Sequence, residues 1–280
     1  MPPADPIDPT DPTDPTDPAD RFASTESHYA AHRPAYGDQA LDYLRDRFAL
    51  DDDARVLDLG CGTGQLSIPL APSVGQVVGV DPNEAMLEEA RRGAEAAGVD
   101  NAEWVVGSDA DLGTMRDDLA PLRLTTMGRS FHWMDQGRTL DHLHGATEPG
   151  GGVALVTDGE WLTKGRESWQ EEVYAVAADY LDDLPERVDP DSVEYDDPWD
   201  AKLEAFGFDD TETRVFAVDR EWSVDGVVGY VFSLSFASPA TFGGRKEAFE
   251  VDLRERLTAL GGGPFTQRAR VEVISGKTSA

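Results

Sequence analysis

Residues Arg55–Gly64 read RVLDLGCGTG, a short apolar run followed by a turn rich in glycine. Such an uninterrupted apolar run is typical of a strand buried on both faces of a sheet. The run stops at Gly60, and an apolar, helix-like segment follows Gly64. Glycine lacks the Cβ that would keep a ligand away from the backbone, and a helix N-terminus attracts anions. The stretch therefore predicts a nucleotide site, and the alternative is a strand-to-helix turn that binds nothing.

The spacing of the glycines indicates which nucleotide is bound. Gly60, Gly62 and Gly64 give G-x-G-x-G, whereas a dinucleotide site would show G-x-G-x-x-G. Asp58 lies two residues before the first glycine. This Asp-x-Gly-x-Gly-x-Gly pattern resembles motif I of the class I S-adenosylmethionine-dependent methyltransferases. The resemblance implies S-adenosylmethionine as cofactor, with Asp58 helping to hold its methionine end and the three glycines passing beneath its adenosine.

A second apolar run, Gln76–Asp81 (QVVGVD), ends in a carboxylate. An acid at the tip of this strand can accept hydrogen bonds from both hydroxyls of a ribose. Pro82 and Asn83 then open a predicted helix that ends at Gly98. The sequence DPNEAML from Asp81 onward is similar to the corresponding segment of the same methyltransferase family. The resemblance therefore implies that Asp81 binds the cofactor ribose.

The third predicted strand, Glu103–Val106, is followed by Ser108 and Asp109. In the family that this chain resembles, an acid or a small polar residue here contacts the adenine amine. The alignment leaves the register open, because Ser108 falls on the common acid position while Asp109 is the neighbouring carboxylate. Both are predicted adenine-binding residues, with Asp109 favoured.

The segment Tyr29–Tyr36 (YAAHRPAY) resembles a Tyr-x-x-x-Arg-Pro-x-Tyr stretch that precedes the core of many small-molecule methyltransferases and forms a lid. The resemblance implies that Tyr29 closes over the methionine end of the cofactor. Arg33 can bind a carboxylate through two parallel hydrogen bonds and is a candidate catalytic residue. The alternative is a surface turn in which Pro34 only ends a helix.

The fourth predicted strand, Leu122–Met127, leads into GRSFHWMD at Gly128–Asp135. This wording resembles a subgroup that includes trans-aconitate methyltransferase, and the carboxyl ends of parallel strands form the ligand crevice of an open sheet. His132 is therefore a candidate to orient or deprotonate the acceptor. Trp133 can wall the cofactor or its sulfonium methyl, since an aromatic face favours a positive charge. The alternatives are a capping or core role for His132 and core packing for Trp133.

The composition of the chain indicates which kinds of partner it can bind. The formal net charge is -31 and the pI is about 4.2, a balance that disfavours nucleic acid and anionic membranes. Scarce lysine and abundant aspartate suggest a chain from a halophile, the alternative being an ordinary acidic enzyme. Cys61, the only cysteine, is read as a packing residue, and the paired histidines are too few for a metal site. No apolar span or signal peptide is visible, so we expect a cytoplasmic protein without a membrane partner.

The chain divides into three predicted parts. Residues 1–20 form a disordered acidic tail with Asp-Pro-Thr repeats, because nothing in them can be buried. Residues 21–157 form the cofactor-binding core with its N-terminal lid, and residues 158–280 form a cap insertion and complete the sheet. The predicted fold is an α/β, doubly wound, Rossmann-like and mostly parallel seven-stranded sheet with a helical cap. Arg270–Ser275 is predicted to close one edge as an antiparallel strand.

The predicted activity is methyl transfer from S-adenosylmethionine to a small-molecule acceptor, a carboxylate or a hydroxyl. Arg33, Arg129 and Arg138 are candidates to clamp a carboxylate, and a hydroxyl would need His132 as a base. Arg123 stands where the family usually has an acid, which leaves open a non-catalytic cofactor-binding protein. A nicotinamide-dependent oxidoreductase is disfavoured by the glycine spacing, and the oligomeric state is left open.

Overall fold

A computed structural model describes residues 22, 24–189 and 198–279 of the chain. The predicted acidic tail, 1–20, lies outside these residues. Among the described residues, no helix combines the length and the hydropathy that a bilayer crossing requires.

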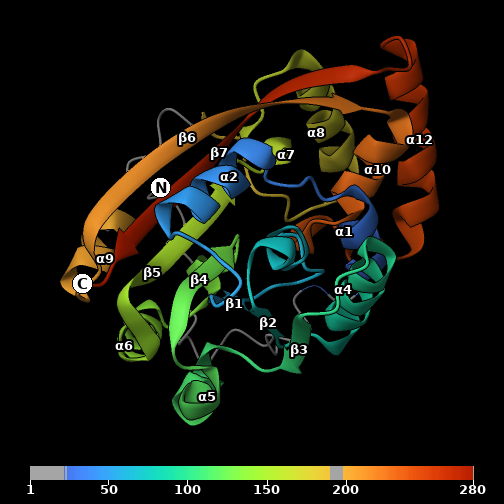
Figure 1. Cartoon of the computed structure of the whole chain (residues 1–280). Helices are drawn as coiled ribbons and strands as arrows, with labels where there is room; N and C mark the ends of the chain where they lie inside the picture. The colour runs from blue at the N-terminus through green and yellow to red at the C-terminus, as the bar shows by residue number, and fades with distance from the viewer. Residues whose placement is uncertain (1–21, 23, 190–197, 280) are drawn as a thin grey trace.

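A seven-stranded sheet with the order β3-β2-β1-β4-β5-β7-β6 forms the centre of the fold (Figure 1). The pairings from β3 through β2, β1 and β4 to β5 are all parallel. β7 is antiparallel to both of its neighbours, β5 and β6, so the sheet is mixed. The strands are β1 (Arg55–Leu59), β2 (Gln76–Asp81), β3 (Ala102–Val106), β4 (Leu122–Gly128), β5 (Thr147–Asp158), β6 (Asp209–Trp222) and β7 (Phe265–Lys277).

The α/β prediction with seven strands is confirmed, but the prediction that the last strand closes an edge is wrong. β7 lies between β5 and β6, and β6 forms the edge. The reason is that β6 forms a long antiparallel pair with β7, which runs from Asp209 to Trp222 of β6. This pairing is much longer than the alternating stretch Arg270–Ser275 from which the edge strand was predicted. Figure 1 shows both strands continuing past the parallel strands toward α8, α10 and α12, which belong to the predicted cap region, 158–280.

Helices cover both faces of the sheet because alternate strand residues point to opposite sides. Val56 packs with α2 (Asp38–Arg47) and α3 (Ser67–Leu70) in one buried cluster. The next residue, Leu57, packs with α5 (Leu112–Leu119), α6 (Gln136–Ala146) and α9 (Trp199–Ala205) in another. The buried strand predicted at 55–59 is therefore confirmed, whereas the helix-like segment after Gly64 is only one short turn.

The helix after β2 fixes the position of the second predicted site. α4 (Glu84–Ala97) begins at Asn83, whose side chain accepts hydrogen bonds from the backbone N–H groups of Ala85 and Met86. It ends at Gly98, which has a left-handed φ of 70°. Both predicted ends are confirmed, and the cap places Asp81 and Asn83 together at the strand tip.

A separate apolar cluster forms beside the sheet from the helices that follow β5 and β6. Its centre is aromatic: Trp161 lies 4.5 Å from the Tyr230 ring, stacked on it, and both are buried. Helix α1 (Glu26–His32) packs against α10 of this cluster (Figure 1). The helices of the cluster are α7 (Trp161–Lys164), α8 (Ser168–Tyr180), α10 (Val224–Phe232), α11 (Pro239–Phe242) and α12 (Lys246–Ala259).

Candidate active site

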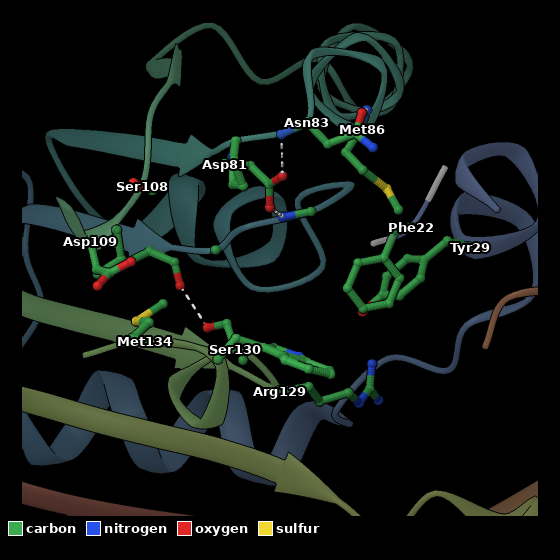
Figure 2. Close-up of a pocket in the computed structure, with 16 residues that line it drawn as sticks. Phe22, Tyr29, Asp81, Asn83, Met86, Ser108, Asp109, Arg129, Ser130 and Met134 are labelled. Carbon is green, nitrogen blue, oxygen red and sulfur yellow. Dashed lines mark hydrogen bonds between the residues drawn. The ribbon is translucent and has the colours of Figure 1, made fainter. Parts of the chain in front are cut away.

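A cavity opens at the carboxyl ends of β1, β2, β3 and β4, and its empty space together with its open mouth is about 770 Å³. Figure 2 shows Ser108, Asp109 and Met134 at one end and Phe22, Tyr29 and Met86 at the other, with Asp81 between them. The remaining lining residues are Leu59, Gly60, Gly62, Pro82, Asn83, Gly128, Arg129, Ser130 and Trp133. The cavity thus collects seven of the predicted site residues, which are Tyr29, Gly60, Gly62, Asp81, Ser108, Asp109 and Trp133.

The glycine turn is required by its backbone and by its surroundings. Gly60, Gly62 and Gly64 all have positive φ, at 69°, 53° and 81°. A Cβ on Gly60 would lie 2.5 Å from the Cβ of Ser130, and one on Gly64 would lie 2.9 Å from the Trp104 ring. At Gly62 the nearest atom would be a carbon of Tyr29, at 3.8 Å. Gly62 is therefore the glycine that leaves room for a ligand, whereas Gly64 serves packing and lies outside the lining.

Asp81 lines the cavity, and two backbone N–H groups fix the position of its carboxylate. One oxygen accepts a hydrogen bond from the Gly62 N–H at 2.8 Å, and the other accepts one from the Asn83 N–H at 2.9 Å (Figure 2). Burial raises the pKa of Asp81, against the lowering effect of these two backbone hydrogen bonds. A carboxylate has about four lone-pair sites, so each oxygen keeps the capacity to accept a hydrogen bond from a ligand hydroxyl.

Asp58 lies beside the main cavity, and its predicted role at the methionine end of the cofactor stays a prediction. Its oxygens accept hydrogen bonds from Ser67 (the N–H at 3.1 Å and the hydroxyl at 2.5 Å) and from the Thr126 hydroxyl at 2.9 Å. Burial is the main influence and raises the pKa of Asp58 to about 6, although these hydrogen bonds act in the opposite direction. Asp58 borders a smaller space beside the main cavity, together with Tyr36 and Gln65. The network indicates that Asp58 fixes the glycine turn to α3 and β4.

Ser108 and Asp109 both line the end of the cavity near Met134. The Ser108 hydroxyl accepts from the Ala110 N–H and donates to Asp111, so it caps the short turn that follows β3. Asp109 accepts a hydrogen bond from the Asp135 N–H at 3.1 Å. The two residues between which the alignment could not decide are thus neighbours on one wall of the cavity. Which of them contacts the adenine stays a prediction.

An aromatic wall covers the other end. The Phe22 ring meets the rings of Tyr29 and Trp133 edge to face, with centroids 6.0 and 6.5 Å apart. Tyr29 comes from α1, which precedes the sheet in sequence and is held against the cap helix α10. Phe22 was not among the predicted site residues. The one feature of the sequence that points to it is that it is the first aromatic residue after the acidic tail.

Arg129 also lines the cavity, and its backbone has a left-handed φ of 56°. Its guanidinium forms an ion pair with Asp158 and donates to the Gln65 side chain at 3.1 Å and to the Pro34 carbonyl at 2.9 Å. Burial lowers the pKa of Arg129, but the Asp158 charge outweighs it and the pKa is raised overall. A left-handed φ is uncommon outside glycine and indicates that the surrounding contacts determine this conformation.

Two predicted catalytic residues lie outside the lining. His132 is exposed, and its ring centroid is 4.8 Å from that of Trp133. Arg33 lies between the rings of Tyr29 and Tyr230, with its guanidinium carbon 5.4 and 5.2 Å from their centroids. The assignment of either residue to catalysis stays a prediction.

The departure at Arg123 does not touch the cavity. Arg123 lies at the amino end of β4, where it pairs with Glu148 and donates to the Phe48 carbonyl. The cavity is at the opposite end of the same strand, at Gly128. The arginine at this position therefore takes part in a partly exposed ion pair with Glu148, away from the candidate site.

Residues 56–151 match the family model described as a methyltransferase domain. An uncharacterised methyltransferase of Mycobacterium bovis is 30% identical over 168 residues, which are 60% of this chain and 63% of that protein. The chain therefore spans less than two thirds of the length of this relative.

Other relatives match a shorter stretch of the chain. A 23S rRNA (uracil(1939)-C(5))-methyltransferase of Xylella fastidiosa is 42% identical over 98 residues, 35% of this chain and 18% of that protein. The predicted exclusion of nucleic acid as a partner is therefore not supported by the relatives. Neither a trans-aconitate subtype nor a halophilic source is indicated by them.

Solved structures share the fold over most of the chain. A putative type II methyltransferase from Anaeromyxobacter dehalogenans superposes with a TM-score of 0.59 at 23% identity, covering 89% of this chain and 99% of that one. A Thiobacillus denitrificans methyltransferase, solved with S-adenosylhomocysteine, gives a TM-score of 0.51 at 20% identity, covering 91% and 96%.

Proposed function

We propose that this protein is an S-adenosylmethionine-dependent methyltransferase that acts on a small-molecule acceptor. The observation that carries the proposal is the Asp81 carboxylate, which faces the cavity with both oxygens anchored and both able to accept another hydrogen bond. A ribose presents two neighbouring hydroxyls, which is the matching donor pair. The methyltransferase match over residues 56–151 supports the same cofactor.

The residues that line the cavity fit S-adenosylmethionine. Asp81 would hold the ribose, Ser108 and Asp109 the adenine, and the backbone at Gly60 and Gly62 would pass beneath the adenosine. When bound, this cofactor supplies a methyl group carried on a positively charged sulfur. Trp133 and Tyr29 would present aromatic faces to that charge and keep water away from it. The protein's main contribution would be to hold donor and acceptor in line.

The acceptor class follows from where the candidate base lies. A hydroxyl acceptor needs a residue that removes its proton, and His132 is exposed and outside the cavity lining. A carboxylate acceptor is already ionised and needs no base. We therefore favour a small carboxylate, and the overall charge of -31 favours a small molecule over the polyanionic backbone of RNA.

Binding of S-adenosylhomocysteine and of NAD to the purified full chain, measured by calorimetry, tests the cofactor. We expect the first to bind and NAD to fail. Replacing Asp81→Asn removes charge-assisted hydrogen bonds, each of which is worth about 1.5–3 kcal/mol, so the affinity should fall about 10- to 100-fold. Asp117→Asn, an exposed charge change on α5, is the matched control and should bind normally.

Methyl transfer itself is tested with a labelled methyl donor and a metabolite extract, at low and at molar salt. Label should appear in the small-molecule fraction and not in added RNA. Cofactor binding without transfer to any acceptor would favour a non-catalytic binding protein, and absence of S-adenosylhomocysteine binding would refute the proposal outright.

A further inference from the structure

Two arginines share one buried carboxylate in this acidic chain. The chain carries 55 acidic and 24 basic residues. Around Asp158, however, two arginines form direct ion pairs: Arg129, and Arg220 at 2.9 Å. Burial alone would raise the pKa of Asp158, but Arg129, Arg220 and then Arg33 hold it below its usual value. Two guanidinium groups thus pair directly with one buried carboxylate, and the charge of a third, that of Arg33, also acts on it.

Arg33 is the member of this group without a hydrogen-bonding partner. Its Nε and Nη1 atoms are buried, and no described residue accepts a hydrogen bond from them. The rings of Tyr29 and Tyr230 both lie close to the guanidinium. A buried donor that makes no hydrogen bond is costly, more so when it is charged, so such a group is expected to have a partner in the working state.

The position of Arg33 suggests which partner this is. Tyr29 lines the cavity proposed for the cofactor, whereas Tyr230 belongs to the apolar cluster of the cap. No described residue of the cap helices lines that cavity. Arg33 therefore lies at the boundary between the cavity and the cap, behind Tyr29, where a second molecule entering from the cap side would meet it.

We propose that Arg33 binds a carboxylate of the methyl acceptor, an inference that rests on the proposed methyltransferase function. The planar guanidinium matches a carboxylate through two parallel hydrogen bonds, and the adjoining Arg129 and Arg220 add to the attraction. Since protein atoms cover Nε and Nη1, the carboxylate reaches them when Tyr29 or Tyr230 shifts. The acceptor is thus a small organic acid, and its charge is the feature that the site selects.

The test compares acids with their uncharged amides on the full chain loaded with S-adenosylhomocysteine at low salt. The compounds are succinate, glutarate and benzoate against succinamide, glutaramide and benzamide, with binding measured by calorimetry. We expect at least one acid to bind about 10-fold tighter than its amide. Arg33→Gln should abolish that preference and Arg33→Lys should reduce it, while Arg92→Gln, at an exposed arginine on α4, should keep it.

Several outcomes would overturn the inference. One is the absence of any acid preference in the wild type, and another is a preference that survives in Arg33→Gln. A third concerns the cofactor: if Arg33→Gln weakens S-adenosylhomocysteine but not methylthioadenosine, which lacks the amino-acid part, the guanidinium serves the cofactor carboxylate instead. Thermal unfolding of each variant shows that it is folded. Failure of S-adenosylhomocysteine to bind the wild type would instead refute the proposed function, and the comparison of acids with amides can still be made without it.

Discussion

The close crossing of α1 and α10 at Gly229 gives a sharp test of whether α1 is a lid on the cavity. A Cβ built on Gly229 would lie 2.0 Å from Cδ2 and 2.3 Å from Cγ of His32. Ordinary van der Waals contact begins near 3.4 Å, so Gly229→Ala requires α1 or the His32 ring to move by roughly 1 Å or more. Overpacking of this kind costs about 1–3 kcal/mol.

We expect that cost to fall on the docked position of α1. Phe22 and Tyr29 form one wall of the cavity, and Tyr29 lies on α1, which packs on α10 and on α4. If only the docked arrangement binds the cofactor well, a penalty of about 1–3 kcal/mol lowers the affinity for S-adenosylhomocysteine by about 5- to 100-fold. Calorimetric titration of the purified variant measures this directly.

The same helix offers a matched control. A Cβ on Gly226 would have its nearest neighbour at 3.3 Å, the Ser223 hydroxyl, and would not meet α1. Gly226→Ala should therefore bind S-adenosylhomocysteine like the wild type. Removing the ring as well, in His32→Ala with Gly229→Ala, should restore affinity, since the two changes are coupled through one contact. If Gly229→Ala binds as tightly as Gly226→Ala, the assignment of α1 as a lid is refuted.

Three further predictions follow from charges and their surroundings. Because burial raises the pKa of Asp58 to about 6, above the unfolded value of 3.8, its contribution to stability is complete below pH 4 and is lost as the pH rises through 6. Asp58→Asn should flatten that loss, about 3 kcal/mol, in urea unfolding measured from pH 4 to 7, and parallel curves would contradict this. His132→Ala should keep methyl transfer to a carboxylate within about twofold, because no base is needed, and a loss of turnover would indicate a hydroxyl acceptor. Added KCl should raise the unfolding free energy by screening the net charge of -31, whereas a midpoint independent of salt would show that self-repulsion is unimportant.

The parts of the site that the sequence predicts are those whose geometry is local. The glycine turn and Asp81 follow directly from a strand, a turn and a helix that are adjacent in the chain. Asn83 caps α4 at the predicted position because its side chain reaches N–H groups two and three residues away. Such short-range constraints are visible in spacing alone.

The parts that escaped prediction depend on contacts between distant segments. Phe22 lies against Tyr29 of α1, and α1 packs on α10, more than 190 residues later in the chain. The hydrogen bonds that the Asp58 oxygens accept from Ser67 and Thr126 were not predicted, because the Thr126 hydroxyl comes from a neighbouring strand. The position of β7 inside the sheet likewise follows from its pairing on both sides, which alternation along one strand does not reveal.

The segment that joins α1 to the core explains why a change in the lid is expected to reach the cavity. Three consecutive carbonyls accept hydrogen bonds from three separate elements: Arg33 from Gln65 at 2.8 Å, Pro34 from Arg129 and Ala35 from Arg220, both at 2.9 Å. Gln65 follows the glycine turn, Arg129 ends β4 and Arg220 lies in β6. This segment cannot shift as a unit without breaking all three hydrogen bonds, so α1 would pivot about it rather than slide. A pivot here turns Tyr29 away from Arg33, whose carbonyl stays held by Gln65, so opening of the aromatic wall would also uncover the buried guanidinium.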